Sequence, residues 1–167
     1  MARKILNALT WLILACMILF AAVLLVPRLM GLQMYAVLTG SMQPAIPAGA
    51  LVYTEQVQAG QLKQGDVITF RQGSGAVVTH RIVSIDEEGN ITTKGDANNV
   101  EDQATITAAQ VIGRVKFHLP VLGALCEWFK TRTGILTVTG VLIVLILSVF
   151  LPEIFSHNGR SAGRKKD

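Results

Sequence analysis

The chain has 167 residues, of which 51% are hydrophobic and 16% are charged, and its formal net charge is +4. Soluble domains average about 25% charged residues, so this balance indicates a membrane protein and excludes an ordinary soluble protein built around a single core. The central part, residues 27–133, contains nine basic and nine acidic residues. Because a neutral domain offers little to phosphate groups, we set nucleic-acid binding aside.

The first 26 residues are typical of a membrane anchor. Arg3 and Lys4 in the short segment 1–4 precede an uncharged run of 22 residues, 5–26. As a helix, a run of this length spans about 33 Å, enough to cross a bilayer core of about 30 Å. Cleaved signal peptides have apolar runs of about 7–15 residues and small residues at the cleavage site. Neither feature is present, so we expect a retained anchor.

The central segment is predicted to be a small all-β domain, which makes the fold class mainly β. Short runs of β-prone residues bounded by Gly, Pro, Asn or charged turns occur at 50–53, 66–71, 77–85, 90–93 and 111–117. Residues 87–90 predict a hairpin turn, because Gly and Asn tolerate the left-handed region. No helical period of comparable length lies between residues 49 and 117.

A second uncharged run of 18 residues, 134–151, is followed by Pro152 and by the basic tail 152–167. As a helix it spans about 27 Å, so we expect a second transmembrane helix that ends at the proline. Residues 117–133 are expected to lie at the lipid surface, with a short helix across 119–130. Under the positive-inside rule, both termini are cytoplasmic, and the domain 27–133 lies on the extracytoplasmic face of a multi-pass cell-membrane protein.

Two polar residues lie where catalytic groups could be presented. Ser41 lies in a tight turn between Gly40 and Pro44, which presents its hydroxyl and its own backbone N–H. A serine in such a turn is most often structural. Strand alternation places His80 on the apolar face of the strand 77–85. A lone histidine on an apolar face is usually a packing residue.

The polar loop 94–102 supplies two further candidates, Asp96 and Asp102, either of which could orient an imidazole. Its composition is equally typical of an ordinary turn. The joint pattern is more informative, because a hydroxyl becomes nucleophilic when a base lies within reach and an acid holds that base in the correct tautomer. Ser41, His80 and one of the two aspartates would form this set.

Neither a metal nor a cofactor is expected. His80, His118 and His157 do not show the spacing of metal ligands, which argues against a zinc site. Cys16 lies within the first apolar run and Cys126 in the interfacial segment. Their separation excludes a disulfide framework, and neither thiol has the neighbours that would make it a nucleophile.

The sequence resembles the type I signal peptidases, in the branch found in the endoplasmic reticulum, in archaea and in some sporulating Gram-positive bacteria. The resemblance extends over roughly residues 34–117. Four boxes match in order and in approximate spacing: LTGSMQP at 38–44, GDVI at 65–68, Thr79-His80-Arg81, and KGDANNVED at 94–102.

By this resemblance Ser41 is the nucleophile, His80 the general base, Asp102 the catalytic aspartate and Asp96 a second acid nearby. The better-known bacterial members use a lysine base, whose pKa must fall from about 10.4 to near 7. Histidine is suited to the task with an ordinary pKa of about 6.5, which favours the serine–histidine branch. The family usually has serine at position 39; here the Thr39 hydroxyl is expected to form an oxyanion hole with the Ser41 backbone N–H.

The resemblance implies a membrane-bound serine endopeptidase that removes N-terminal signal peptides after small residues such as Ala. Its partners would be secretory preproteins carrying signal peptides and the lipid bilayer, with the protein translocation machinery as a further candidate. Two alternatives differ in class. One is a catalytically silent, membrane-anchored β-domain that acts as an assembly subunit; the other is a self-processing serine–lysine protease of the repressor type, which the two apolar runs and the histidine disfavour.

Overall fold

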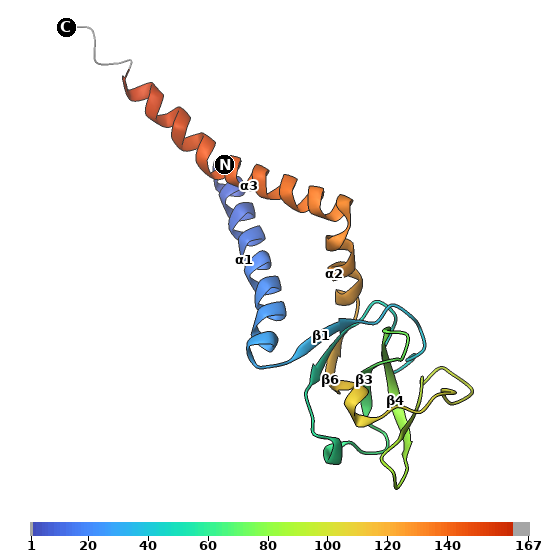
Figure 1. Cartoon of the computed structure of the whole chain (residues 1–167). Helices are drawn as coiled ribbons and strands as arrows, with labels where there is room; N and C mark the ends of the chain where they lie inside the picture. The colour runs from blue at the N-terminus through green and yellow to red at the C-terminus, as the bar shows by residue number, and fades with distance from the viewer. Residues whose placement is uncertain (1, 162–167) are drawn as a thin grey trace, which may run out of the picture. The chain divides into compact units, whose positions relative to one another are not determined.

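A computed structural model describes the backbone of residues 2–161 and the side chains of residues 7–58 and 60–147. The chain divides into two compact units (Figure 1). One unit is the β-rich segment Val23–Glu127, and the other consists of the helical segments before and after it.

The first and last helices are longer than the sequence predicts, and the short helix between them begins three residues later than predicted. Helix α1 (Ala2–Leu29) contains the predicted run 5–26, and α2 (Leu122–Lys130) is the short helix expected within 119–130. Helix α3 (Arg132–Ser161) continues past the end expected at Pro152. A proline removes one backbone donor, and long apolar helices often accommodate this loss without ending. The side chains of the tail 152–167 lie outside the described residues.

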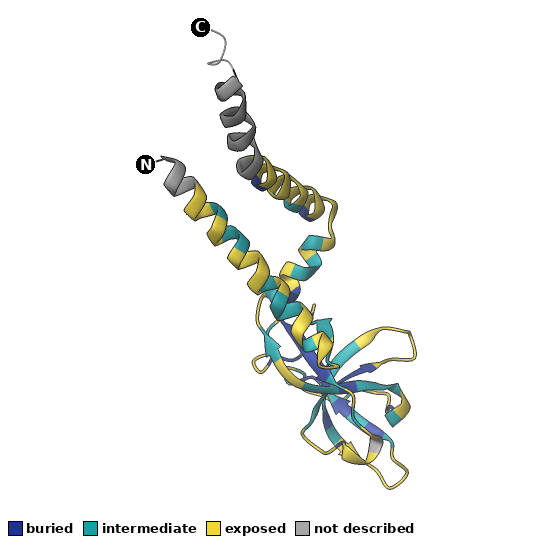
Figure 2. Ribbon diagram, turned by 90° about the vertical axis from the view of Figure 1, so that its left-hand side faces the viewer, coloured by how far each residue is buried: buried dark blue, intermediate teal, exposed yellow. Residues whose placement is uncertain are grey.

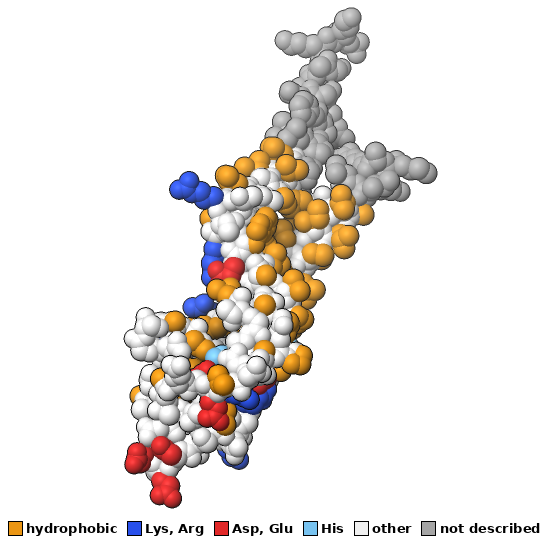
Figure 3. All heavy atoms as spheres, turned by 90° about the vertical axis from the view of Figure 1, so that its right-hand side faces the viewer, with side chains coloured by type: hydrophobic (Ala, Val, Ile, Leu, Met, Phe, Trp, Pro, Cys, Tyr) orange, Lys and Arg blue, Asp and Glu red, His pale blue; other side chains and the backbone are white. Residues whose placement is uncertain are grey.

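One described helix, Asn7–Leu29, is long and apolar enough to cross a membrane by itself, with a mean hydropathy of 2.8. Leu122–Lys130 and Arg132–Leu147 pass the same test only as a pair, and they meet at a bend of 89°. The second transmembrane helix across 134–151 therefore stays a prediction. Exposed hydrophobic side chains are spread over the visible face of the described helical segments (Figure 3).

The β-rich unit contains one six-stranded sheet with the order β1-β2-β6-β3-β4-β5, and every neighbouring pair is antiparallel. The strands are β1 (Gln33–Ala36), β2 (Leu51–Glu55), β3 (Val67–Arg71), β4 (Val77–Ile85), β5 (Ile91–Lys94) and β6 (Val111–Leu119). Short 3-10 helices, η1 (Ala59–Gln61) and η2 (Ala108–Gln110), precede β3 and β6. The mainly β prediction for this segment is confirmed.

Five of the six strands were predicted, each to within two residues at either end. The strand 77–85 was predicted with its observed bounds, and the turn 87–90 joins it to β5. In that turn Gly89 has a φ of +84°, and its N–H donates to the Asp86 carbonyl. Strand β1 is not predicted by the sequence, because its four residues show no clear alternation and are ordered by pairing with β2.

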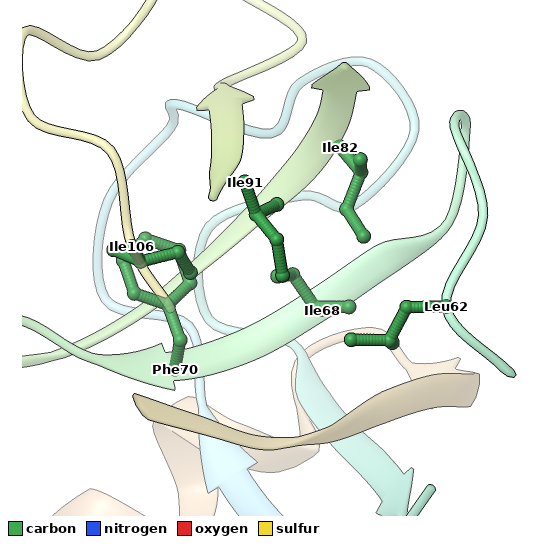
Figure 4. Packing of buried hydrophobic residues seen from close by; sticks show 6 residues of the cluster. All are labelled: Leu62, Ile68, Phe70, Ile82, Ile91 and Ile106. Atoms are coloured by element: carbon green, nitrogen blue, oxygen red, sulfur yellow. The ribbon is translucent and has the colours of Figure 1, made fainter. Parts of the chain in front are cut away.

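Two apolar clusters form the interior of the sheet unit, and Figure 2 shows its buried residues concentrated on the strands. One cluster joins β3, β4 and β5 (Figure 4) and consists of Leu62, Ile68, Phe70, Ile82, Ile91 and Ile106. The other lies beside the connection from β1 to β2 and consists of Val37, Met42, Ile46, Ala50 and Val52. The candidate catalytic residues lie on segments that these two clusters support.

Tyr53 connects the sheet to the last turns of α1. Pro27 has no N–H, so the Val23 carbonyl lacks the donor that a helix normally provides four residues later. The buried Tyr53 hydroxyl donates to this carbonyl at 3.1 Å, and its ring stacks on Phe117 with the ring centroids 4.5 Å apart. Burial raises the pKa of Tyr53 above its ordinary value, so the hydroxyl keeps the proton that it donates.

Candidate active site

Ser41 lies in the connection between β1 and β2, on a turn that the apolar interior holds in place. The next residue, Met42, is fully buried in the second cluster. Backbone bonds close the turn on both sides, from Gln43 N–H to the Gly40 carbonyl at 3.0 Å and from Ile46 N–H to the Met42 carbonyl at 2.8 Å. The burial of Met42 therefore anchors a turn on which Ser41 remains half-buried.

His80 lies near the middle of β4, opposite Ile68 on β3. It is only 8% exposed, as strand alternation predicts, and its ring packs edge-on against Phe70. Its Nδ1 lies 2.6 Å from Asp102 Oδ2, and its Nε2 lies 3.2 Å from Ser41 Oγ. Because a carboxylate can only accept, Nδ1 carries the proton, and Nε2 is left as an acceptor for the Ser41 hydroxyl.

The two aspartates of the loop 94–102 have separate partners. Asp102 contacts His80, whereas Asp96 accepts two hydrogen bonds from the Arg81 guanidinium, at 2.8 Å from Nε and 2.7 Å from Nη2. Arg81 also donates to the Gly65 carbonyl at 2.8 Å. Consecutive strand residues point to opposite faces, so His80 and Arg81 reach different aspartates. Asp96, expected in the catalytic set, is thus engaged by Arg81, and its hydrogen bonds raise the pKa of Arg81.

The same loop packs directly against the backbone of the serine turn. Ala97 N–H donates to the Ser41 carbonyl at 2.8 Å. A Cβ atom at the buried Gly95 would lie 2.6 Å from that carbonyl oxygen and 2.9 Å from Asn98 Nδ2, closer than real contacts allow. The glycine of the KGD box is therefore required by the close approach of two backbones.

Thr39 lies two residues before Ser41 and is exposed. Its Oγ1 lies 3.3 Å from Ser41 Oγ, so the two hydroxyl groups can share a hydrogen bond. The hydroxyl expected in the oxyanion hole thus lies beside the candidate nucleophile.

The other polar candidates lie elsewhere. His118 lies on β6, opposite Val52. The His157 side chain lies outside the described residues. No disulfide joins Cys16 and Cys126. Among the described side chains, no group of three or more His, Cys, Asp or Glu residues could hold a metal ion.

One further residue contacts the site without having been predicted: Thr93, a fully buried residue of β5, donates its hydroxyl to Asp102 Oδ2 at 2.6 Å. The pairing of Arg81 with Asp96 was not predicted either. Two signals were available. Thr93 is a polar residue at an inward position of a predicted strand, and Arg81 is a cation directly after the candidate base on the opposite strand face.

Comparisons with known proteins place the chain in a family. The model of the family described as "Signal peptidase, peptidase S26" matches residues 9–100. The chain is 37% identical over 99 residues to signal peptidase I W of Bacillus subtilis (strain 168), covering 56% of this chain and 52% of the relative. It is 28% identical over 125 residues to the signal peptidase complex catalytic subunit SEC11C of Homo sapiens, covering 65% of each. For the catalytic subunit sec11 of Dictyostelium discoideum the identity is 36% over 99 residues, covering 52% of this chain and 55% of the relative.

The chain thus spans between half and two thirds of the length of these curated relatives. The matched region contains Ser41, His80 and Asp96 and ends two residues before Asp102. The resemblance drawn from the four sequence boxes, including the branch shared with the endoplasmic-reticulum enzymes, is confirmed. The chain belongs to the signal peptidase family, peptidase S26.

Proposed function

We propose that this protein is a membrane-bound serine endopeptidase that removes N-terminal signal peptides from translocated preproteins. One observation carries the proposal, the hydrogen-bonded series from Asp102 Oδ2 through the His80 imidazole to Ser41 Oγ, with contacts of 2.6 and 3.2 Å. Membership of the signal peptidase family supports the choice of substrate.

In the proposed reaction, Ser41 Oγ attacks the scissile carbonyl while His80 Nε2 takes the hydroxyl proton. Asp102 stabilises the imidazolium that forms and keeps its ring oriented. The imidazolium then gives its proton to the leaving amine of the mature protein, and the signal peptide remains as an ester on Ser41. A water molecule, deprotonated by His80, attacks this ester and releases the signal peptide.

The negative charge that develops on the scissile carbonyl oxygen requires hydrogen-bond donors. We assign this task to the Ser41 backbone N–H and the Thr39 hydroxyl. Support comes from the position of Thr39 Oγ1, which lies 3.3 Å from the attacking oxygen. The extra methyl group of threonine, relative to the family's usual serine, would restrict rotation of this hydroxyl.

The proposed membrane arrangement places both termini in the cytoplasm and the sheet unit on the extracytoplasmic face. Support comes from the basic residues outside the two apolar runs, two before the first and four after the second, against two acidic residues in the same segments. The span Asn7–Leu29 supports the first crossing. Substrate signal peptides lie in the same bilayer, so tethering raises the effective concentration of Ser41 near the scissile bond.

The proposed partners are preproteins that carry signal peptides, the lipid bilayer and, as a further candidate, the translocation machinery. SEC11C is named as the catalytic subunit of a signal peptidase complex. Because the sheet unit carries the whole hydrogen-bonded series, we infer that this chain needs no second subunit to complete its catalytic set.

Purified full-length protein in lipid vesicles, incubated with a preprotein, tests the proposal. Wild type should cleave at one position, whereas Ser41→Ala and His80→Ala should be inactive but normally inserted in the membrane. Ser84→Ala, which alters an exposed serine on β4, is the matched control and should cleave normally. Cleavage by His80→Ala at the normal rate would exclude the proposed base. Failure of wild type to cleave any preprotein would favour the assembly-subunit alternative.

A further inference from the structure

The catalytic aspartate proposed above is held at two points by one residue of β5. The Asp102 backbone N–H donates to the Thr93 carbonyl at 2.9 Å, and the Thr93 hydroxyl donates to Asp102 Oδ2 at 2.6 Å. Thr93 has no exposed surface, and it lies opposite Ile82 of β4, two residues from His80. The backbone carbonyl and the side-chain hydroxyl of Thr93 therefore both form hydrogen bonds with Asp102.

The surrounding backbone makes this contact rigid. Two residues before Thr93, Ile91 exchanges a pair of backbone hydrogen bonds with Ile106, at 2.7 and 2.9 Å. Both isoleucines are buried in the first apolar cluster. The chain from Asp102 to Ile106 thus follows the outer edge of β5 and is joined to it at both ends.

The Thr93 hydroxyl and His80 Nδ1 both donate a hydrogen bond to the same carboxylate oxygen, Asp102 Oδ2, each at 2.6 Å. A threonine hydroxyl can donate only one proton, and here its acceptor is a carboxylate, which makes the bond charge-assisted and short. With both donors on Oδ2, rotation of the carboxylate would break two hydrogen bonds at once. Asp102 Oδ2 is therefore held in place between the Thr93 hydroxyl and His80 Nδ1.

We propose that Thr93 is a positioning residue for the peptidase reaction: its hydroxyl fixes the Asp102 carboxylate so that His80 Nε2 faces Ser41 Oγ. This inference rests on the proposed function. Without the hydroxyl, Asp102 keeps its charge and its backbone bond but loses the restraint on its side-chain torsion. The imidazole then samples orientations in which Nε2 no longer reaches the serine, which slows proton transfer and leaves substrate binding unchanged.

Thr93→Val tests the proposal, because valine keeps the branched shape that a buried strand position favours and removes only the hydroxyl. Thr93→Ser restores a donor at the same position. Thr69→Val is the matched control: Thr69 is also fully buried, on β3, and its hydroxyl bonds to Thr79 Oγ1 at 2.9 Å rather than to a catalytic group. All variants are assayed as full-length protein on one peptide substrate, below their melting temperatures.

For Thr93→Val we expect kcat to fall roughly 10- to 100-fold while KM stays within about twofold, the range for losing one hydrogen bond to a charged group. Thr93→Ser should recover most of kcat, and Thr69→Val should keep the wild-type kcat. The low-field proton resonance of His80 Nδ1–H should be shifted or broadened in Thr93→Val only.

Two results would overturn the inference. One is a wild-type kcat in Thr93→Val; the other is an equal loss of kcat in Thr93→Val and Thr69→Val, which would indicate a general effect on packing. If either occurs while Ser41→Ala is inactive, the positioning role fails and the proposed function stands. If Ser41→Ala itself remains active, the proposed function fails.

Discussion

Replacing Asp96 by Asn separates the roles of the two loop aspartates, because Asp96 contacts Arg81 and Asp102 contacts His80. The substitution removes the charge that accepts two hydrogen bonds from Arg81. The Arg81 side chain is 38% exposed and that of Asp96 is 16% exposed, so solvent weakens the pair relative to a buried one. The contribution of this pair to stability should lie between that of an exposed ion pair and that of a hydrogen bond to a charged group. We therefore expect the free energy of unfolding to fall by about 1–2 kcal/mol.

For a unit of the size of Val23–Glu127, a loss of this order lowers the melting temperature by roughly 5–15 °C. The effect on catalysis should be smaller and indirect, because Asp96 contacts Arg81 and the neighbouring Ala97 N–H donates to the Ser41 backbone carbonyl, not to its hydroxyl. We expect kcat of folded Asp96→Asn to fall by no more than about tenfold. Asp102→Asn should instead lower kcat by roughly 10³- to 10⁴-fold, because Asn can hold the imidazole in the wrong tautomer.

Thermal unfolding followed by circular dichroism, together with kcat measured at about 20 °C below each midpoint, distinguishes the two aspartates. Arg81→Gln and the double variant with Asp96→Asn complete a double-mutant cycle, and the two substitutions should not be additive in stability. A loss of activity in Asp96→Asn as severe as in Asp102→Asn, with an unchanged melting temperature, would refute the separate roles of the two aspartates.

Two further substitutions probe other contacts. Gly95→Ala should lower kcat and stability together, because its Cβ would displace the Ser41 carbonyl by overlap at 2.6 Å; wild-type kinetics would exclude that close approach. Hydrogen bonds from Arg114 lower the pKa of Glu55 in the folded protein. Glu55 therefore stabilises the fold at pH values above its unfolded pKa of about 4.5, and this stabilisation is lost as the pH falls through its lower pKa in the folded state. Glu55→Gln should therefore unfold more easily than wild type at neutral pH and equally easily in acid, as denaturant titrations at both pH values will show.

The parts of the fold that the sequence predicts are those with strong local patterns. Alternation in Val77–Ile85 and the Gly-Asn turn after it define β4 and its hairpin with β5. The strand β1 has no such pattern, because the order of Gln33–Ala36 comes from pairing with β2 across a long connection. Helix α3 continues past Pro152, since a local helix-breaking residue does not decide the end of a long apolar helix.

The residues of the candidate site also divide into those with a local sequence pattern and those that only the tertiary structure brings to the site. Boxes in the sequence predict Ser41 and His80 as catalytic residues, and strand alternation predicts the buried position of the histidine. Two aspartates six residues apart in one loop are equivalent by composition. The family resemblance favours Asp102, and the path of the loop beside β4 and β5 brings Asp102 to the imidazole. Thr93 has no motif at all, because its importance depends on the tertiary placement of the residue that it contacts.

The central claim is that Ser41 Oγ, activated by His80, forms a covalent ester with the signal peptide. Incubating the full-length protein with a preprotein, quenching in acid and mapping the peptides by mass spectrometry tests this directly. We expect the mass of the cleaved signal peptide, less one water, on the peptide that contains Ser41, and no such adduct in His80→Ala. Cleavage of the preprotein with the adduct on another residue, or an adduct on Ser41 at the normal rate in His80→Ala, would contradict the account.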